Sequence, residues 1–160
     1  MSTNEIRWEY DNVVIGHKNE PRIVEVSAKL IEEYALSVRN TNPAYTENSK
    51  TRTLAMPSML MRVAPLRRQE IASNNGFTAL ERAAQNPRQT PFAKCEMRWF
   101  GNLNSGDTIT SYTEVFAKEI KRGNKFVTFR VHADNQHGSK VGEYDYTCIF
   151  EYGETNKVGE

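Results

Sequence analysis

Charge of one sign, long apolar runs and cysteine are all scarce in this chain. The 160 residues carry a formal net charge of +1, which argues against a dedicated nucleic-acid-binding protein, because such proteins normally carry a strong basic excess. No stretch approaches the roughly 20 apolar residues that a membrane span needs, and the N-terminus has no apolar run of signal-peptide length. We therefore expect a cytoplasmic protein that binds neither nucleic acid nor membrane.

Only two cysteines are present, Cys95 and Cys148. They fall in predicted strands and do not have the spacing of a metal site, so we expect reduced thiols, no metal and no cofactor. The length suits one domain with a sizeable core, which we place at residues 1–152. Residues 153–160 are polar and are expected to form a flexible tail.

The first half of the chain predicts helices. Apolar residues recur at helical spacing over 28–38, and Ser27 is a plausible N-cap for this helix. A second helix is expected from Pro57, because proline is tolerated in a first helical turn, and Pro65 should end or kink it. Residues 73–91 read as irregular, with a short helix at 79–84.

The second half predicts long antiparallel strands joined by turns. In the first of them, Ala93, Cys95, Met97 and Trp99 alternate with charged residues and form the apolar face. The expected strands cover residues 92–100, 108–120, 125–133 and 142–152. The third also alternates, which places Val127, Phe129, Val131 and Ala133 on one face. Early helices followed by a run of strands indicate an α+β fold.

The most informative stretch is Arg39-Asn40-Thr41-Asn42-Pro43-Ala44-Tyr45. It resembles the active-site motif Asp-x-Asn-Pro-x-His of the MaoC-like hot-dog hydratases and dehydratases, with Asn40 in place of the Asp and Tyr45 in place of the His. Residues 54–59 look like the segment that opens the family's central helix, and residues 100–141 resemble its strand and hairpin pattern. The joint resemblance covers residues 10–152, and the most similar variety is the FAS1-like N-terminal dehydratase domain.

This resemblance implies a hot-dog fold, in which a long antiparallel sheet wraps around a long central helix. It also implies a homodimer, or a heterodimer with a catalytic hot-dog subunit, with the site near the interface. The family's substrates are acyl-CoA or acyl-ACP thioesters, and its reaction is the reversible hydration of a trans-2-enoyl thioester to a 3-hydroxyacyl thioester.

Hydration of an enoyl thioester needs a base, an acid and a donor that stabilises charge on the thioester oxygen. The start of the helix at Pro57 can provide the donor, because its first N–H groups are free; Ser58 and Met59 are the candidates. We expect Pro57, Ser58 and Met59 to contact the substrate, together with Asn42 and Arg62.

The base is the missing part. Asn40 has no titratable proton near neutrality, and Tyr45, with an ordinary pKa of about 10, is a poor base at pH 7. Both stand at the catalytic positions, and we interpret them as a motif retained for loop shape and substrate contact. No other residue completes the pair: His132 is expected to be a surface histidine on the polar face of its strand, and Asp107 a structural turn residue.

Two basic clusters could meet the phosphates of CoA, or could form an ordinary solvated face. The first consists of Arg62, Arg67 and Arg68, and the second of Lys121 and Arg122.

Three hypotheses remain open for the function, and whether the chain is itself an enzyme is part of the question. The first is an acyl-thioester-binding subunit that is non-catalytic alone and pairs with a catalytic hot-dog subunit; the irregular segment 73–91 fits it. The second is an active hydratase or dehydratase that uses altered residues such as Tyr45. The third is a non-enzymatic acyl-CoA-binding module.

Overall fold

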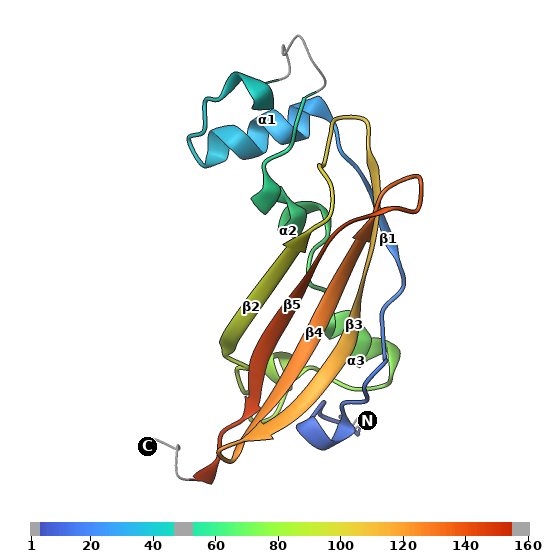
Figure 1. The fold of residues 1–160 in the computed structure, drawn as a ribbon. Coiled ribbons are helices and arrows are strands. Elements are labelled where there is room, and N and C mark those ends of the chain that lie inside the picture. The colour runs from blue at the N-terminus through green and yellow to red at the C-terminus, as the bar shows by residue number, and fades with distance from the viewer. Residues whose placement is uncertain (1–3, 47–52, 155–160) are drawn as a thin grey trace.

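The computed structural model describes residues 4–46 and 53–154, and within them one five-stranded antiparallel sheet has the helices on one side (Figure 1). The strands follow the order β1-β3-β4-β5-β2, so that β1 and β2 form the two edges. They are β1 Arg22–Glu25, β2 Phe92–Trp99, β3 Thr108–Lys121, β4 Asn124–Asp134 and β5 Lys140–Glu151. The part of the expected tail that follows Glu154 lies outside the described residues. No helix in the described ranges is long and apolar enough to cross a membrane.

The helices are short and lie mainly in the first half of the chain, as predicted. The side chain of Ser27 caps α1 by accepting a hydrogen bond from the Leu30 N–H at 3.0 Å. The α-helices are α1 Ala28–Ser37, α2 Leu60–Val63 and α3 Arg68–Asn74. Four 3₁₀ turns accompany them: η1 Tyr10–Asn12, η2 Pro43–Tyr45, η3 Pro57–Met59 and η4 Leu80–Arg82. The helix expected at 79–84 is thus only the single turn η4.

The central helix is interrupted, contrary to the long helix that the family resemblance implied. It begins at Pro57 as expected, runs through η3 and α2, and stops before Pro65; α3 starts only at Arg68. A proline there cannot donate the helical hydrogen bond and clashes with the preceding turn. The hydroxyl of Tyr144 in β5 donates to the Ala64 carbonyl at 2.7 Å and so anchors the break to the sheet.

The inner face of the sheet packs against these helices in two clusters. Near α1 and α2, Met59, Leu60 and Val63 are buried against β3, β4 and β5. Near α3, the N-terminal segment covers the sheet, and the ring of Trp8 lies 5.8 Å from those of both Phe129 and Phe150. The expected alternation of β4, with Val127, Phe129, Val131 and Ala133 on one face, is confirmed by their complete burial.

The outer face of the sheet, opposite the helices, is covered by no described helix or strand and carries a layer of paired charges. Arg98 and Arg130 bridge Asp145 at 2.9 and 2.6 Å, and Arg98 also contacts Glu143 at 2.9 Å. The long arginine side chains lie over the carboxylates, which are therefore only 9–10% exposed. His132 belongs to this layer: it stacks on Tyr112, bonds to Glu114 at 2.8 Å and is 12% exposed. His132 thus lies on the polar outer face, as expected, although its neighbours cover most of its side chain.

The two edge strands depart most from the sequence prediction. In β2, the register shifts between Phe92 and Lys94, so that Phe92 shares the inner face with Cys95 and Ala93 does not. The expected apolar face was therefore wrong at Ala93. β1 was not predicted, because its four residues, Arg-Ile-Val-Glu, are almost all exposed and show no clear alternation.

Candidate functional site

The motif loop, residues 40–45, begins where α1 ends. Arg39 adopts a left-handed conformation with φ of 58°, its N–H donates to the Leu36 carbonyl at 2.9 Å, and the Asn40 N–H donates to the Ala35 carbonyl at 2.8 Å. These two bonds form the Schellman arrangement that ends many helices. The position of Asn40 is therefore fixed by the helix terminus.

The side chains of both motif asparagines support the backbone of the loop. The Asn40 Oδ1 accepts from the Asn42 N–H at 3.0 Å, and the Asn42 Oδ1 accepts from the Ala44 N–H at 3.0 Å. The amide of Asn40 also contacts the sulfur of Met56, with Nδ2 and Sδ 3.7 Å apart. Both asparagine oxygens thus hold the loop in shape, and Asn40 joins it to the segment that opens the central helix.

Tyr45 ends the loop and lies partly buried against the core cluster around α1 and α2. Its N–H donates to the Asn42 carbonyl at 3.0 Å, and the neighbouring Ala44 carbonyl accepts from the Leu54 N–H at 3.1 Å. In the described ranges, neither a carboxylate nor an imidazole bonds to Asn40 or Tyr45. Within residues 4–46 and 53–154, the structure therefore joins the motif loop to the helix entry through Asn40 and Met56 but places no acid–base partner on Asn40 or Tyr45.

The helix entry at η3 is held by two aromatic residues. The indole N–H of Trp99 donates to the Pro57 carbonyl at 2.9 Å, and the Tyr34 hydroxyl donates to the Ser58 Oγ at 3.1 Å. The Met59 N–H already donates to the Met56 carbonyl at 2.9 Å. Of the two expected donors, the amide of exposed Ser58 is therefore the better candidate.

Sequence reasoning missed the roles of Tyr34 and Trp99. It placed both on apolar faces, whereas each also uses its one polar group to fix the entry of the central helix. The available signal was their amphipathic chemistry, because the polar atoms of Tyr and Trp usually find partners when the rings are packed. A small cavity of about 50 Å³ adjoins this entry, lined by Met56, Pro57, Trp99 and residues 101–103.

The predicted arginine cluster is divided. Arg62 is exposed on α2, whereas Arg67 pairs with Glu70 at 2.7 Å and Arg68 with Glu81 at 2.7 Å. Asp107 has the expected structural role, since its carboxylate accepts from the Asn104 N–H at 2.8 Å and from Gln136 at 3.1 Å.

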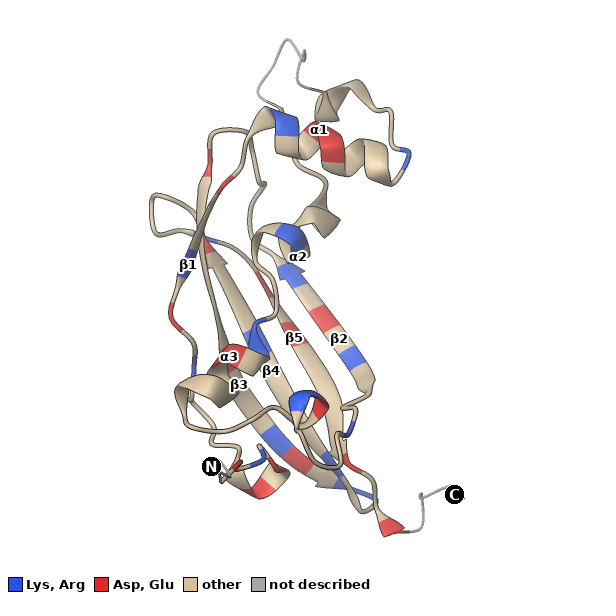
Figure 2. Cartoon of the chain, turned by 180° about the vertical axis from the view of Figure 1, so that it is seen from behind, with Lys and Arg blue, Asp and Glu red and all other residues tan. Residues whose placement is uncertain are grey.

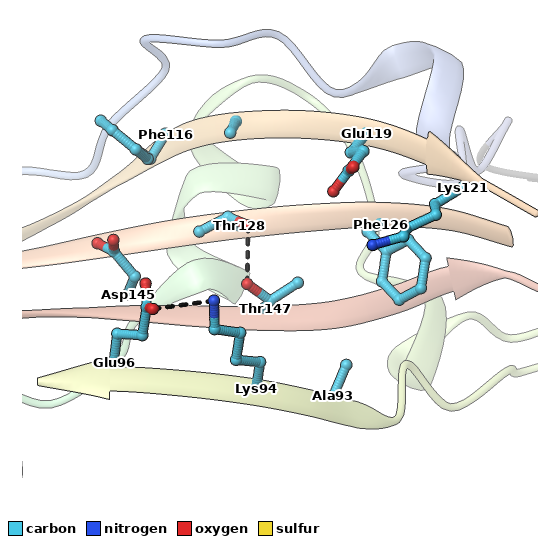
Figure 3. A pocket seen from close by; sticks show the side chains of 11 residues that line it. Ala93, Lys94, Glu96, Phe116, Glu119, Lys121, Phe126, Thr128, Asp145 and Thr147 are labelled. Carbon is cyan, nitrogen blue, oxygen red and sulfur yellow. Dashed lines mark hydrogen bonds and ion pairs between the residues drawn. The ribbon is translucent and has the colours of Figure 1, made fainter.

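A larger cavity of about 430 Å³ lies on the outer face of the sheet, opposite the helices (Figure 3). Phe116 and Asp145 stand at one end and Phe126 and Lys121 at the other. Two of its three carboxylates have ion-pair partners: Glu96 pairs with Lys94 at 2.9 Å, and Asp145 pairs with two arginines. Because no motif residue reaches this face, we place the candidate site at the motif loop and helix entry.

The two free thiols lie on the inner face of the sheet and are poorly suited to nucleophilic chemistry. Burial raises the pKa of the Cys148 thiol to about 11 and also raises the pKa of Cys95, so both remain protonated at neutral pH. The thiolate is the reactive form. In the described part of the chain, no group of three or more His, Cys, Asp or Glu residues could hold a metal ion.

Comparisons with known proteins agree with this architecture. The model of the FAS1-like, dehydratase domain region matches residues 13–144, while no curated protein sequence matches the chain. Among solved structures, a monoamine oxidase regulatory protein from Archaeoglobus fulgius is similar, with 18% identity, a TM-score of 0.67 and coverage of 91% of this chain and 95% of that one.

Two further structures are enzymes by description. The first is the C-terminally truncated HadBC (3R-hydroxyacyl-ACP dehydratase) complex from Mycobacterium tuberculosis, with 13% identity, a TM-score of 0.59 and coverage of 81% and 91%. The second is the R-hydratase PhaJ1 from Pseudomonas aeruginosa, with 18% identity, a TM-score of 0.58 and coverage of 92% and 88%. At these identities the likeness shows the fold alone, and it confirms the expected α+β hot-dog fold.

Proposed function

Because the chain belongs to the family of the FAS1-like dehydratase domain region, we propose that it is the acyl-thioester-binding subunit of a MaoC-like enoyl-thioester hydratase. In this proposal it is non-catalytic alone and pairs with a catalytic hot-dog subunit. The partner supplies the base and the acid, and this chain forms part of the wall along the acyl group.

The observation that carries the proposal is the use of Asn40. Its oxygen accepts the Asn42 N–H at 3.0 Å, and its amide faces the sulfur of Met56. A side chain that is engaged in this way, and that has no proton to exchange near neutrality, cannot activate water. In this proposal the loop keeps its hydrogen-bonded shape at the positions that the motif resemblance assigns to the family's acid–base groups.

The helix entry supports a binding role for the same site. Tyr34 and Trp99 fix the η3 turn, which leaves the Ser58 amide and the exposed Ser58 hydroxyl near the motif loop. Preorganised donors of this kind stabilise charge on a carbonyl oxygen. We propose that Ser58 contacts the thioester carbonyl, with Asn42, Pro57 and Met59 in the surrounding wall and Arg62 nearer the solvent.

The free edge of the sheet supports pairing with a second hot-dog chain. β2 is an edge strand with one unpaired row of backbone groups, and such edges readily pair with another chain. Large apolar side chains are exposed on and beside it: Phe92 and Phe100 at 57% and Trp99 at 48%. The HadBC neighbour is itself a complex of two chains.

The test is hydration of crotonyl-CoA by the purified chain, alone and after co-expression with a hot-dog subunit that has an intact Asp-x-Asn-Pro-x-His motif. We expect no turnover by the chain alone, turnover by the pair, and weaker crotonyl-CoA binding by the pair with Ser58→Pro, which removes the amide donor. Tyr152→Phe, an exposed position remote from the loop, is the matched control.

Turnover by the chain alone that Tyr45→Phe abolishes would refute the non-catalytic subunit and would favour an active hydratase with altered residues. Thioester binding without turnover, alone and with every candidate partner, would instead favour a non-enzymatic acyl-CoA-binding module. The same turnover and binding measurements therefore distinguish the proposal from the active hydratase and from the binding module.

A further inference from the structure

A second cavity on the helix-covered side of the sheet has a strongly basic wall. It measures about 420 Å³ and lies between η4 and α3, which is labelled in Figure 2. Its polar lining is Arg67, Arg68, Gln69, Glu70, Ser73 and Arg82. We propose that this cavity is a binding site for a phosphate-bearing anion.

Arg67 is held in place before any ligand arrives. Its guanidinium donates to the Glu70 carboxylate at 2.7 Å and to the carbonyls of Glu20 and Ser111 at 3.0 and 3.1 Å. The side chain is only 11% exposed. Ordering an arginine normally costs side-chain entropy on binding, and here the fold has already met that cost.

Arg68 is fixed in a similar way from behind the cavity. One of its nitrogens donates to Glu81 at 2.7 Å, and another donates to the hydroxyl of Thr90 and contacts the sulfur of Cys148 at 3.6 Å. Glu81 orients Arg68 but is not part of the cavity wall. The positive charge of Arg68 therefore faces a cavity that does not contain its counter-charge.

Arg82 supplies a third guanidinium from η4, opposite α3. It is exposed, and no ion pair joins it to another described residue. Arg67 is paired with Glu70 and Arg68 with Glu81, so the three arginines and two carboxylates at and directly behind the wall leave one net positive charge, that of Arg82. A phosphate group suits this lining, because it carries up to two charges and several acceptor oxygens, and because guanidinium forks match its geometry.

Glu70 makes the site testable in both directions. It is half-exposed and pairs with Arg67, so it competes with any anion for the same nitrogen. Removing its charge should tighten binding, while removing the charge of Arg82 should weaken it. Arg67 keeps its two backbone acceptors in either case, so both variants should fold.

The experiment is isothermal titration of the full chain with sodium pyrophosphate, CoA and pantetheine, at low salt in a buffer free of sulfate and phosphate. Pyrophosphate is the simplest probe, and the pair of CoA and pantetheine separates a CoA phosphate from the rest of that molecule. We expect Arg82→Gln to weaken pyrophosphate binding by about fivefold or more, the loss of one charge-assisted contact at a partly exposed site. Glu70→Gln should tighten it, and the control Lys29→Gln, which removes a positive charge from an exposed position on α1, should leave it unchanged.

The inference is overturned if pyrophosphate does not bind at millimolar concentration, if Lys29→Gln weakens binding as much as Arg82→Gln, or if Glu70→Gln does not tighten it. If CoA binds more tightly than pantetheine and Arg82→Gln removes the difference, CoA is a source of the anion. If CoA and pantetheine behave alike while pyrophosphate binds, the site serves a free phosphate compound. Neither result depends on hydratase turnover, so failure here leaves the proposed function standing.

Discussion

Tyr144→Phe should destabilise the fold through the break in the central helix. The hydroxyl of this fully buried residue donates to the Ala64 carbonyl at 2.7 Å. It therefore satisfies the polar group that directly precedes Pro65. Phenylalanine keeps the ring and its packing but leaves this carbonyl buried without its partner.

The expected cost of Tyr144→Phe follows from that carbonyl. A buried polar group that loses its partner costs about 1–3 kcal/mol, and partial relaxation of the loop lowers this cost, so we expect a loss of about 1–2 kcal/mol. For a domain of this size that corresponds to a melting temperature lower by about 2–8 °C. The free energy of unfolding is best measured by urea denaturation, with Tyr152→Phe as the exposed control. A loss below about 0.5 kcal/mol at an unchanged m value would refute the role assigned to the hydroxyl.

Two further predictions concern stability. Arg39→Gly should raise the free energy of unfolding by about 0.5–1 kcal/mol, because φ of 58° is strained for arginine and natural for glycine. The control Arg62→Gly, inside helix α2, should lower the free energy of unfolding by about 1 kcal/mol. Equal losses for the two variants in urea denaturation would contradict the prediction. The buried Cys148 thiol stays neutral in the fold, with its pKa raised to about 11 from an ordinary 9.0, so its contribution to stability is complete below pH 9 and is lost as pH rises from 9 to 11. Across this range, the free energy of unfolding measured by urea denaturation should fall by about 2–3 kcal/mol more for the wild type than for Cys148→Ala. An equal fall in the two proteins would exclude the effect.

The periodic parts of the fold were predictable from the sequence because burial on one face imposes a pattern. In β4, four alternating residues from Val127 to Ala133 were assigned to the core and are completely buried. The start of the central helix at Pro57 and its interruption at Pro65 also followed from local backbone chemistry. These features depend on neighbours in the sequence.

The features that were missed depend on residues distant in the sequence. The bulge at Ala93 is a matter of pairing between β2 and β5, and the burial of His132 results from contacts with Tyr112 and Glu114 on the next strand. Alternation identified His132 as outward-facing, which is correct, but could not indicate that arginines and carboxylates would cover that face. The motif positions were proposed from the sequence and stay a prediction, whereas the anchoring by Trp99 required the fold.

The shape of the motif loop does not depend on the protonation of any residue that supports it. Its shape rests on two carboxamide oxygens and a helix terminus, and none of these groups gains or loses a proton in the range where proteins are folded. A carboxylate at position 40 would couple the conformation of the loop to its own ionisation at every turn of a proton-transfer cycle. With Asn40 the hydrogen bonds that shape the loop do not depend on a protonation state. The catalytic partner that we propose would therefore take up and release its protons beside a loop whose shape stays the same.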